Sequence, residues 1–140
     1  MKAVFIRGWS GSGKTTMGTE IVEQDKDNTL LIEADQYFTN ATTGQYSYNR
    51  DEIKDAHNWA RMKMAKALRD GFNVVICNTF TKPFEMRDYL EVAQRFGADV
   101  QVLQAQGNYQ NVHNVPDNIV QMQKSRFVSL DAFMTELNLA

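Results

Sequence analysis

The chain has 140 residues, of which 43% are hydrophobic, 11% aromatic and 23% charged, an ordinary globular composition that excludes the disordered and fibrous classes. This length predicts one domain over residues 1–140 that can bury a single core. A formal net charge of −2 and a single cysteine, Cys77, exclude a general affinity for polyanions and an internal disulfide framework.

The first predicted strand, residues 2–7, leads directly into a glycine-rich loop at residues 8–15. The loop has the spacing G-x-x-x-x-G-K-T, in which backbone amides can surround the phosphates of a nucleotide. Lys14 is expected to reach the β- and γ-phosphate oxygens, and the Thr15 hydroxyl to bind Mg²⁺. A predicted helix over residues 14–23 aims its positive dipole end at the same anion. The expected nucleotide-binding residues are Gly8, Trp9, Ser10, Gly11, Ser12, Gly13, Lys14, Thr15 and Thr16, with ATP and Mg²⁺ as the bound species.

The second predicted strand, residues 29–32, is a short apolar run that ends at Glu33-Ala34-Asp35. The carboxyl ends of parallel strands share one edge of a sheet, so we expect Asp35 at the edge that carries the glycine-rich loop. A carboxylate in this position is either a helix cap or a functional group. Residues 39–50 are polar and aromatic without periodicity, which predicts a loop over the site.

A long helix is predicted to follow, since Asn49 with Glu52 forms a capping signature and Gly71 ends the apolar pattern. A third buried strand, residues 72–76, ends at Cys77-Asn78-Thr79, and a helix from Pro83 to Gly97 precedes a fourth strand at residues 100–103. The expected inward stripe of the long helix is Ile53, Ala56, His57, Ala60, Met64, Ala67 and Leu68.

The last third of the chain begins with a polar segment, residues 104–114, which we expect to be a lid loop. A helix over residues 116–127 is predicted to turn Ile119 and Met122 inward, and residues 129–140 are expected to form a helical tail. Alternating strands and helices require right-handed crossovers and a parallel sheet. The predicted fold is therefore an α/β three-layer sandwich.

Five segments, in this order and spacing, resemble the P-loop kinases related to bacteriophage polynucleotide 5′-hydroxyl kinase and to the zeta toxins, a group placed among the AAA-type ATP-binding proteins. The resemblance implies a sheet of order 2-3-1-4 and transfer of the γ-phosphoryl group of ATP to a hydroxyl. It implies a nucleic-acid 5′ end or a nucleotide-like molecule as acceptor, with Asp35 as the general base. The segments are residues 34–38, 56–59, 74–80, 85–89 and 111–116.

The same resemblance implies roles at the ends of two further segments. Asn78, Thr79 and Arg87 correspond to substrate-binding positions, with loop hydrogen bonding as the alternative for Asn78 and Thr79.

Two positions depart from the family. Cys77 stands where relatives carry the Asp of the Mg²⁺ shell, and Gln110 stands where they carry the lid Arg.

In the family the lid arginine is expected to neutralise the charge of the transferring phosphoryl group, and this sequence lacks it. Arg126, as a catalytic residue, or Lys124 could take this role from the helix behind the lid, although solvated surface is the alternative for both. His113 is expected to fix the turn into that helix, where Asn114 also replaces a family glycine.

Two features of the long helix have simpler interpretations. His57 lies on the apolar stripe, which indicates a hydrogen-bonded core residue. Arg61, Lys63, Lys66 and Arg69 form a basic side, which is either solvated or in contact with nucleic acid.

Three functions remain open from the sequence. The favoured one is an ATP-dependent kinase; the others are a catalytically weak ATP-binding module that acts through a partner, and a nucleoside or other small-molecule kinase. No apolar run reaches the length of a membrane span, and no signal peptide is expected. We therefore expect a cytoplasmic protein without a membrane partner.

Overall fold

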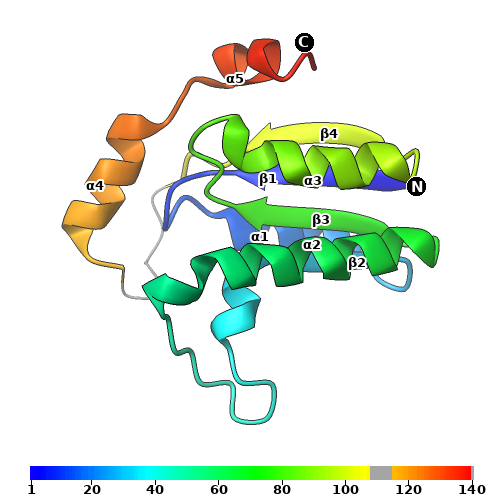
Figure 1. Ribbon diagram of the computed structural model, residues 1–140, viewed down its shortest axis with the longest axis horizontal. Helices are drawn as coiled ribbons and strands as arrows, with labels where there is room; N and C mark the ends of the chain where they lie inside the picture. Colours follow the sequence, from blue (N-terminus) through cyan, green and yellow to red (C-terminus); the bar gives the residue numbers. More distant parts are fainter. Residues whose placement is uncertain (108–114, 140) are drawn as a thin grey trace.

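The computed structural model describes residues 1–107 and 115–139. Its centre is a parallel sheet of four strands in the order β2-β3-β1-β4 (Figure 1). The predicted α/β sandwich and strand order are confirmed. The strands are β1 (Lys2–Arg7), β2 (Thr29–Glu33), β3 (Asn73–Asn78) and β4 (Asp99–Gln104).

Helices cover both faces of the sheet, as the buried apolar runs require. Along β1, Ala3 and Phe5 pack in a core with α2 and α3, while Val4 and Ile6 pack on the opposite side against α1. The helices are α1 (Lys14–Glu23), α2 (Ile53–Arg69), α3 (Phe84–Arg95), α4 (Asp117–Arg126) and α5 (Leu130–Glu136).

The carboxyl ends of the strands meet the irregular segments of the chain at one end of the sheet (Figure 1). A 3₁₀ helix, η1 (Ala34–Phe38), follows β2, and another, η2 (Arg50–Glu52), precedes α2. The predicted loop between them, residues 39–50, contains one isolated antiparallel bridge between Thr39 and Tyr46. α4 also lies at this end, and α5 returns along the side of β4 and α3. The glycine-rich loop, η1 and the start of α2 are therefore close to the same edge.

Two residues that were expected to point inward are exposed. Ile53 is 37% exposed in the first turn of α2, and Met122 is 39% exposed on α4. None of the described side chains of α4 is buried, because this helix lies beyond the ends of the strands and not over the sheet. The predicted inward turn of these two side chains is wrong.

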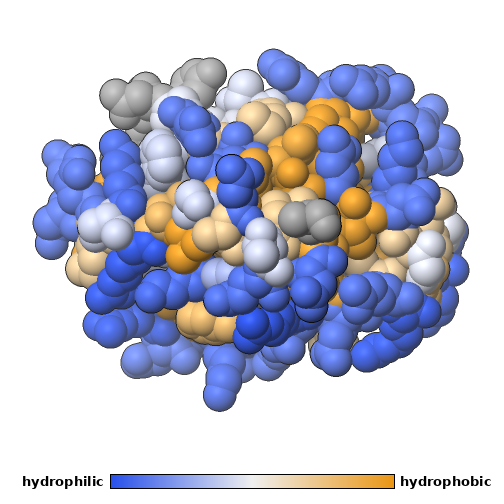
Figure 2. Space-filling model, turned by 90° about the horizontal axis from the view of Figure 1, so that it is seen from above, coloured by the Kyte–Doolittle hydropathy of each residue, from blue (hydrophilic) through white to orange (hydrophobic). Residues whose placement is uncertain are grey.

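The predicted lid at residues 104–114 begins at the last residue of β4, and residues 105–107 follow without regular secondary structure. Its remaining part, residues 108–114 with Gln110, His113 and Asn114, lies outside the described residues, as does residue 140. None of the described helices combines the length and the apolar character needed to cross a bilayer. Seen from the side of α5, apolar side chains lie in the middle of the surface and hydrophilic ones around it (Figure 2).

Candidate active site

The glycine-rich loop turns tightly around its own backbone. Gly11 and Gly13 have positive φ angles of 83° and 95°, a conformation that favours glycine. At Gly8, an added Cβ would lie 2.3 Å from Ser12 Oγ and 2.9 Å from the carbonyl oxygen of Ala105, so no larger residue fits. The loop therefore has the compact shape that brings amide groups together around an anion.

The helix that follows the loop begins without a capping side chain. The N-cap residue of α1 is Gly13, which has no side chain to accept from the first amides of the helix. The first turn contains no acidic residue either. The first N–H groups of a helix have no intrahelical partner. The amides of Lys14, Thr15 and Thr16 are therefore suited to bind phosphate oxygens, as predicted for this segment.

Lys14 is drawn back over the loop. Its Nζ atom donates to the carbonyl oxygen of Trp9 at 3.1 Å. Burial lowers the pKa of Lys14, although Glu33 and Asp35 nearby act in the opposite direction. A cation that has lost solvent is stabilised by an incoming anion, and the phosphate chain of a nucleotide supplies one.

Asp35 lies in η1, at the same edge of the sheet as the loop. The Asn78 side chain holds this turn, since its Oδ1 atom accepts from the backbone N–H of Ala34 at 3.0 Å. The Tyr46 hydroxyl donates to Asp35 Oδ1 at 3.4 Å. Burial, followed by the charge of Asp35, raises the pKa of Tyr46, so its hydroxyl remains a donor. The general-base role of Asp35 stays a prediction, but its position beside Lys14 is the one expected.

A second carboxylate, which sequence reasoning missed, contacts the loop directly. The Thr15 hydroxyl donates to Glu33 Oε1 at 2.7 Å. Glu33 is the last residue of β2 and the register partner of Cys77 on β3. The sequence Glu33-Ala34-Asp35 contained this information, because Glu33 ends the same predicted strand as Asp35 and therefore reaches the same edge of the sheet.

These groups fit Mg²⁺, which prefers hard oxygen ligands and keeps several waters and phosphate oxygens in its shell. Thr15 and Glu33 supply a hydroxyl and a carboxylate on the described part of the chain. No group of three or more His, Cys, Asp or Glu side chains that could hold a metal occurs among the described residues. The donor set therefore suits a cation that is bound together with a nucleotide and not by a protein cage.

The other predicted site residues lie in different surroundings. The carbonyl group of Thr79 accepts from the N–H of Gly8 at 3.2 Å. Arg87 lies on α3 and forms an ion pair with Glu136 of α5 at 3.4 Å. Arg126 is exposed at the end of α4. The structure thus brings Asn78 and Thr79 to the loop but turns Arg87 toward α5, and the roles of all four residues stay predictions.

Contacts of α4 with the glycine-rich loop were not predicted. Gln123 Oε1 accepts from the backbone N–H of Ser10 at 2.8 Å, and the rings of Trp9 and Phe127 meet edge to face with their centroids 5.4 Å apart. Lys124 Nζ lies 5.4 Å from the centroid of the Trp9 ring. Of the two cations proposed for the lid role, Lys124 is therefore the one that contacts a residue of the loop.

Arg7, directly before the loop, is fully buried. Its guanidinium lies 3.9 Å from the ring centroids of both Phe127 and Phe133. It donates to the carbonyl oxygens of Phe80 and Thr81 at 3.0 and 3.1 Å. Burial lowers the pKa of Arg7 to about 10. Arg7 therefore ties the segment after α4 to the end of the sheet.

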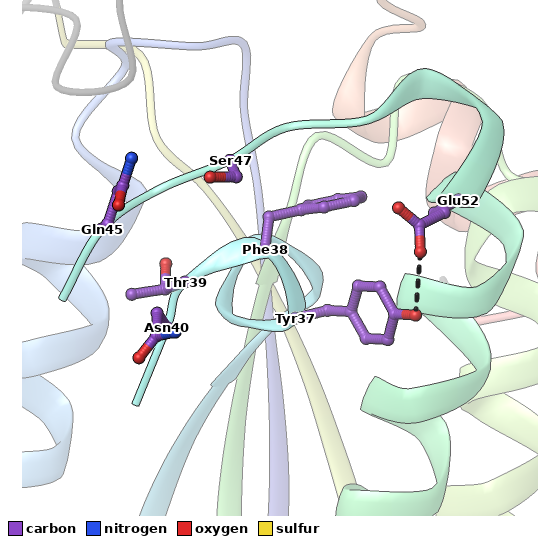
Figure 3. Close-up of a pocket in the computed structure, with 7 residues that line it drawn as sticks. All are labelled: Tyr37, Phe38, Thr39, Asn40, Gln45, Ser47 and Glu52. Atoms are coloured by element: carbon purple, nitrogen blue, oxygen red, sulfur yellow. Dashed lines mark hydrogen bonds between the residues drawn. The ribbon is translucent and has the colours of Figure 1, made fainter. Parts of the chain in front are cut away.

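Two hollows lie near these elements. One, of about 350 Å³, is formed by η1, the loop after it and η2, where the Tyr37 hydroxyl donates to Glu52 Oε1 at 3.4 Å (Figure 3). The other, of about 570 Å³, runs along α2. The first is lined by Tyr37, Phe38, Thr39, Asn40, Gln45, Ser47 and Glu52, and the second by Trp59, Met62, Lys63, Ala65, Lys66, Arg69 and Phe96.

His57 forms a hydrogen bond, as the sequence indicated, and Cys77 is buried. His57 Nδ1 lies 2.7 Å from the Tyr89 hydroxyl, and burial lowers the pKa of His57. Cys77 is 2% exposed, and burial raises the pKa of its thiol. Cys77 therefore packs in the interior, whereas His57 is half-buried against Tyr89.

Comparison with known proteins gives one family and one fold. The profile of the AAA domain family matches residues 4–130. NEDD4-binding protein 2 of Homo sapiens is 27% identical over 93 residues, which are 66% of this chain and 5% of that protein. The chain therefore spans a small part of this curated relative.

Solved structures with a similar fold include a chain of the Pnkp1/Rnl/Hen1 RNA repair complex, with a TM-score of 0.69 and 15% identity over 96% of this chain and 45% of that one. A chain of the PezAT chromosomal toxin-antitoxin system of Streptococcus pneumoniae has a TM-score of 0.59 and 22% identity over 74% of this chain and 46% of that one. At these identities the likeness concerns the fold alone, and it agrees with the predicted resemblance.

Proposed function

The chain belongs to the AAA domain family, in a P-loop kinase-like branch, and from this premise we propose that it transfers the γ-phosphoryl group of ATP to a hydroxyl acceptor. The observation that carries the proposal is the position of Asp35. Its carboxylate lies at the sheet edge that holds the glycine-rich loop, near enough to oppose the lowering of the Lys14 pKa by burial. This position supports the roles that we propose for Asp35 as base and for Lys14 as phosphate-binding cation.

In this proposal each group has a separate task. The amides at the start of α1 and the Lys14 ammonium bind the β- and γ-phosphates. Bound Mg²⁺ would supply further neutralisation of the phosphate charge. Asp35 accepts the proton of the acceptor hydroxyl as its oxygen attacks the γ-phosphorus, and ADP leaves. Tyr46 holds one oxygen of Asp35 in place through its hydrogen bond.

The acceptor that we favour is the 5′-hydroxyl end of a nucleic acid or a nucleotide-like molecule. Its support is the hollow along α2, where Lys63 lies 5.0 Å from the centroid of the Trp59 ring and Lys66 and Arg69 follow on the same side. Cations with aromatic faces bind phosphates and stacked bases of single strands. Lys63 Nζ also donates to Gln36 Oε1 at 3.4 Å, and Gln36 is the neighbour of Asp35. A strand bound along α2 would therefore approach the proposed base.

A small-molecule acceptor is the second candidate, and the hollow of Figure 3 favours it. This space begins in η1, two residues after Asp35, and combines the ring of Tyr37 with the amide of Asn40 and the carboxylate of Glu52. None of the side chains that line it is a cation. Such a lining suits a neutral hydroxylated molecule such as a nucleoside more than a polyphosphate chain.

The test is transfer from γ-labelled ATP to a panel of acceptors: a 5′-hydroxyl oligonucleotide, a nucleoside, a nucleotide and water. Asp35→Asn is expected to reduce transfer by roughly 10²- to 10⁴-fold while ATP affinity changes little. Asp27→Asn, an exposed carboxylate after α1, is the matched control and should keep wild-type activity.

The acceptors distinguish the candidates. Labelling of the oligonucleotide that weakens as salt rises supports a polynucleotide acceptor, because phosphate contacts lose their counterion-release gain. Labelling of the nucleoside alone supports the second candidate. Tight ATP binding without transfer to any acceptor would refute the kinase proposal and favour the catalytically weak binding module.

A further inference from the structure

The hydrogen bond between Thr15 and Glu33 bears on how this chain holds its metal. Thr15 Oγ1 donates its proton to Glu33 Oε1 at 2.7 Å. A hydroxyl whose proton is held in this way presents its oxygen lone pairs to a cation on the opposite side. In P-loop enzymes Mg²⁺ is held by the Ser or Thr of the loop together with an acidic residue from a neighbouring strand. We propose that Glu33 is that acidic residue in this chain, an inference that rests on the proposed function.

Cys77, at the end of β3, cannot take this part. Its side chain is 2% exposed, and its Sγ atom lies 3.6 Å from the carbonyl oxygen of Lys14, to which it donates. A Cβ added at Gly18 would lie only 2.8 Å from the same sulfur, so α1 packs closely over it. Burial also raises the pKa of the thiol. The sulfur is therefore protonated and enclosed, whereas a metal ligand must be deprotonated and accessible.

Glu33 occupies a position on β2 directly beside the one where relatives carry the carboxylate of β3. It is the register partner of Cys77, and neighbouring strands lie about 4.8 Å apart. Glutamate is one methylene longer than aspartate, which offsets part of this displacement, and the carboxylate does reach Thr15. In this assignment the acidic residue near the metal lies on β2 in place of β3, in the same register of the sheet.

The charge balance at the loop agrees with this assignment. Glu33 accepts a hydrogen bond from Thr15, the residue directly after Lys14, so its carboxylate lies close to the bound phosphates of the proposed complex. Without a metal, a carboxylate beside the phosphates repels them. With a divalent cation between the two, the same carboxylate stabilises the complex. Glu33 is thus expected to make nucleotide affinity depend on the metal.

The experiment measures metal affinity directly, with Mn²⁺ as the probe. Electron paramagnetic resonance gives free Mn²⁺ in titrations of the protein saturated with ADP, and calorimetry gives ATP affinity in EDTA. Glu33→Gln is expected to weaken Mn²⁺ binding by about 10- to 100-fold, the usual effect of losing a partner of this kind. ATP affinity in EDTA should stay the same or rise, because one negative charge near the phosphates has been removed. Glu23→Gln, at the end of α1, is the matched control.

Two further variants test the assignment of Glu33 independently of Glu33→Gln. Glu33→Asp keeps the charge but shortens the side chain, so its Mn²⁺ affinity should lie between those of the wild type and Glu33→Gln. If Glu33→Gln does not fold, a Mn²⁺ affinity of Glu33→Asp below that of the wild type supports the assignment, and an unchanged affinity contradicts it. Adding Cys77→Asp to Glu33→Gln should recover Mn²⁺ affinity if the double variant folds.

Wild-type Mn²⁺ affinity in Glu33→Gln would overturn the assignment. So would an equal loss of ATP affinity in EDTA, which indicates a structural role. Failure of the wild-type protein to bind ATP at all would instead refute the proposed function.

Discussion

Replacing Lys14 by methionine should abolish most of the stabilisation by nucleotide without unfolding the protein. Methionine keeps the apolar stem of the side chain and removes the ammonium group. Within the described part of the chain, that group donates to the carbonyl oxygen of Trp9, and burial lowers its pKa. The loss of this bond and the relief of a desolvated charge oppose each other, so the unliganded melting temperature should change by no more than a few degrees.

The expected effect on nucleotide binding can be estimated. ATP–Mg²⁺ at about 100 times its Kd stabilises the wild-type protein by about 2.7 kcal/mol. An unfolding entropy of about 2.1 cal/mol/K per residue gives roughly 0.3 kcal/mol/K for 140 residues and thus a rise of about 9 °C. A charged hydrogen bond to phosphate is worth about 1.5–3 kcal/mol, or roughly 10- to 100-fold in Kd. At the same ATP concentration the stabilisation of Lys14→Met is then about 0.4–1.4 kcal/mol, a rise of only about 1–5 °C.

Differential scanning fluorimetry with and without ATP–Mg²⁺ measures both quantities. Lys26→Met, in the exposed turn after α1, makes the same chemical change away from the loop and should retain the full shift. An unchanged ATP-dependent shift in Lys14→Met would refute the reasoning, and so would the absence of any shift in the wild-type protein.

Arg7→Met should lower the free energy of unfolding by roughly 3–6 kcal/mol, because buried acceptors lose their donor and Phe127 loses its cation–π partner. In urea titrations the exposed control Arg87→Met should lower the free energy of unfolding by less than about 1 kcal/mol. An equally small decrease for Arg7→Met would contradict the stabilising role of the buried Arg7 guanidinium. Because burial lowers the pKa of His57, the unfolded state binds its proton first as the pH falls below about 6.5, and stability decreases by at most about 1.4 kcal/mol per pH unit. His57→Asn, which can still bond to Tyr89, should show a flatter decrease below pH 6.5 in the same titrations, and a profile parallel to that of the wild type would exclude this cause.

The local parts of the fold and the site were predictable from the sequence. The apolar run of β1 and the glycine pattern behind it need only neighbouring residues for their interpretation, and the order of the strands came with the family resemblance. Asp35 and Asn78 follow predicted strands, so their common edge followed from the parallel arrangement. The structure agrees with each of these expectations of position.

Contacts between distant segments were not predictable in this way. Glu33 was passed over because the family pattern directs attention to the end of β3, and only the register of β2 with β3 brings the carboxylate to Thr15. Gln123 reaches the loop from α4, whose apolar spacing wrongly suggested an inward Met122. Periodicity indicates that a helix has two faces, but it does not say whether a sheet lies beneath one of them.

The burial of Arg7 has a consequence for the order in which the chain acquires its structure. Arg7 is synthesised well before Phe127 and Phe133, whose rings enclose its guanidinium. Until they arrive, the neighbourhood of the glycine-rich loop keeps a solvated charge in place of its final packing. The surroundings of the glycine-rich loop are thus completed only after Phe127 and Phe133 have been translated, although its own motif is made long before them.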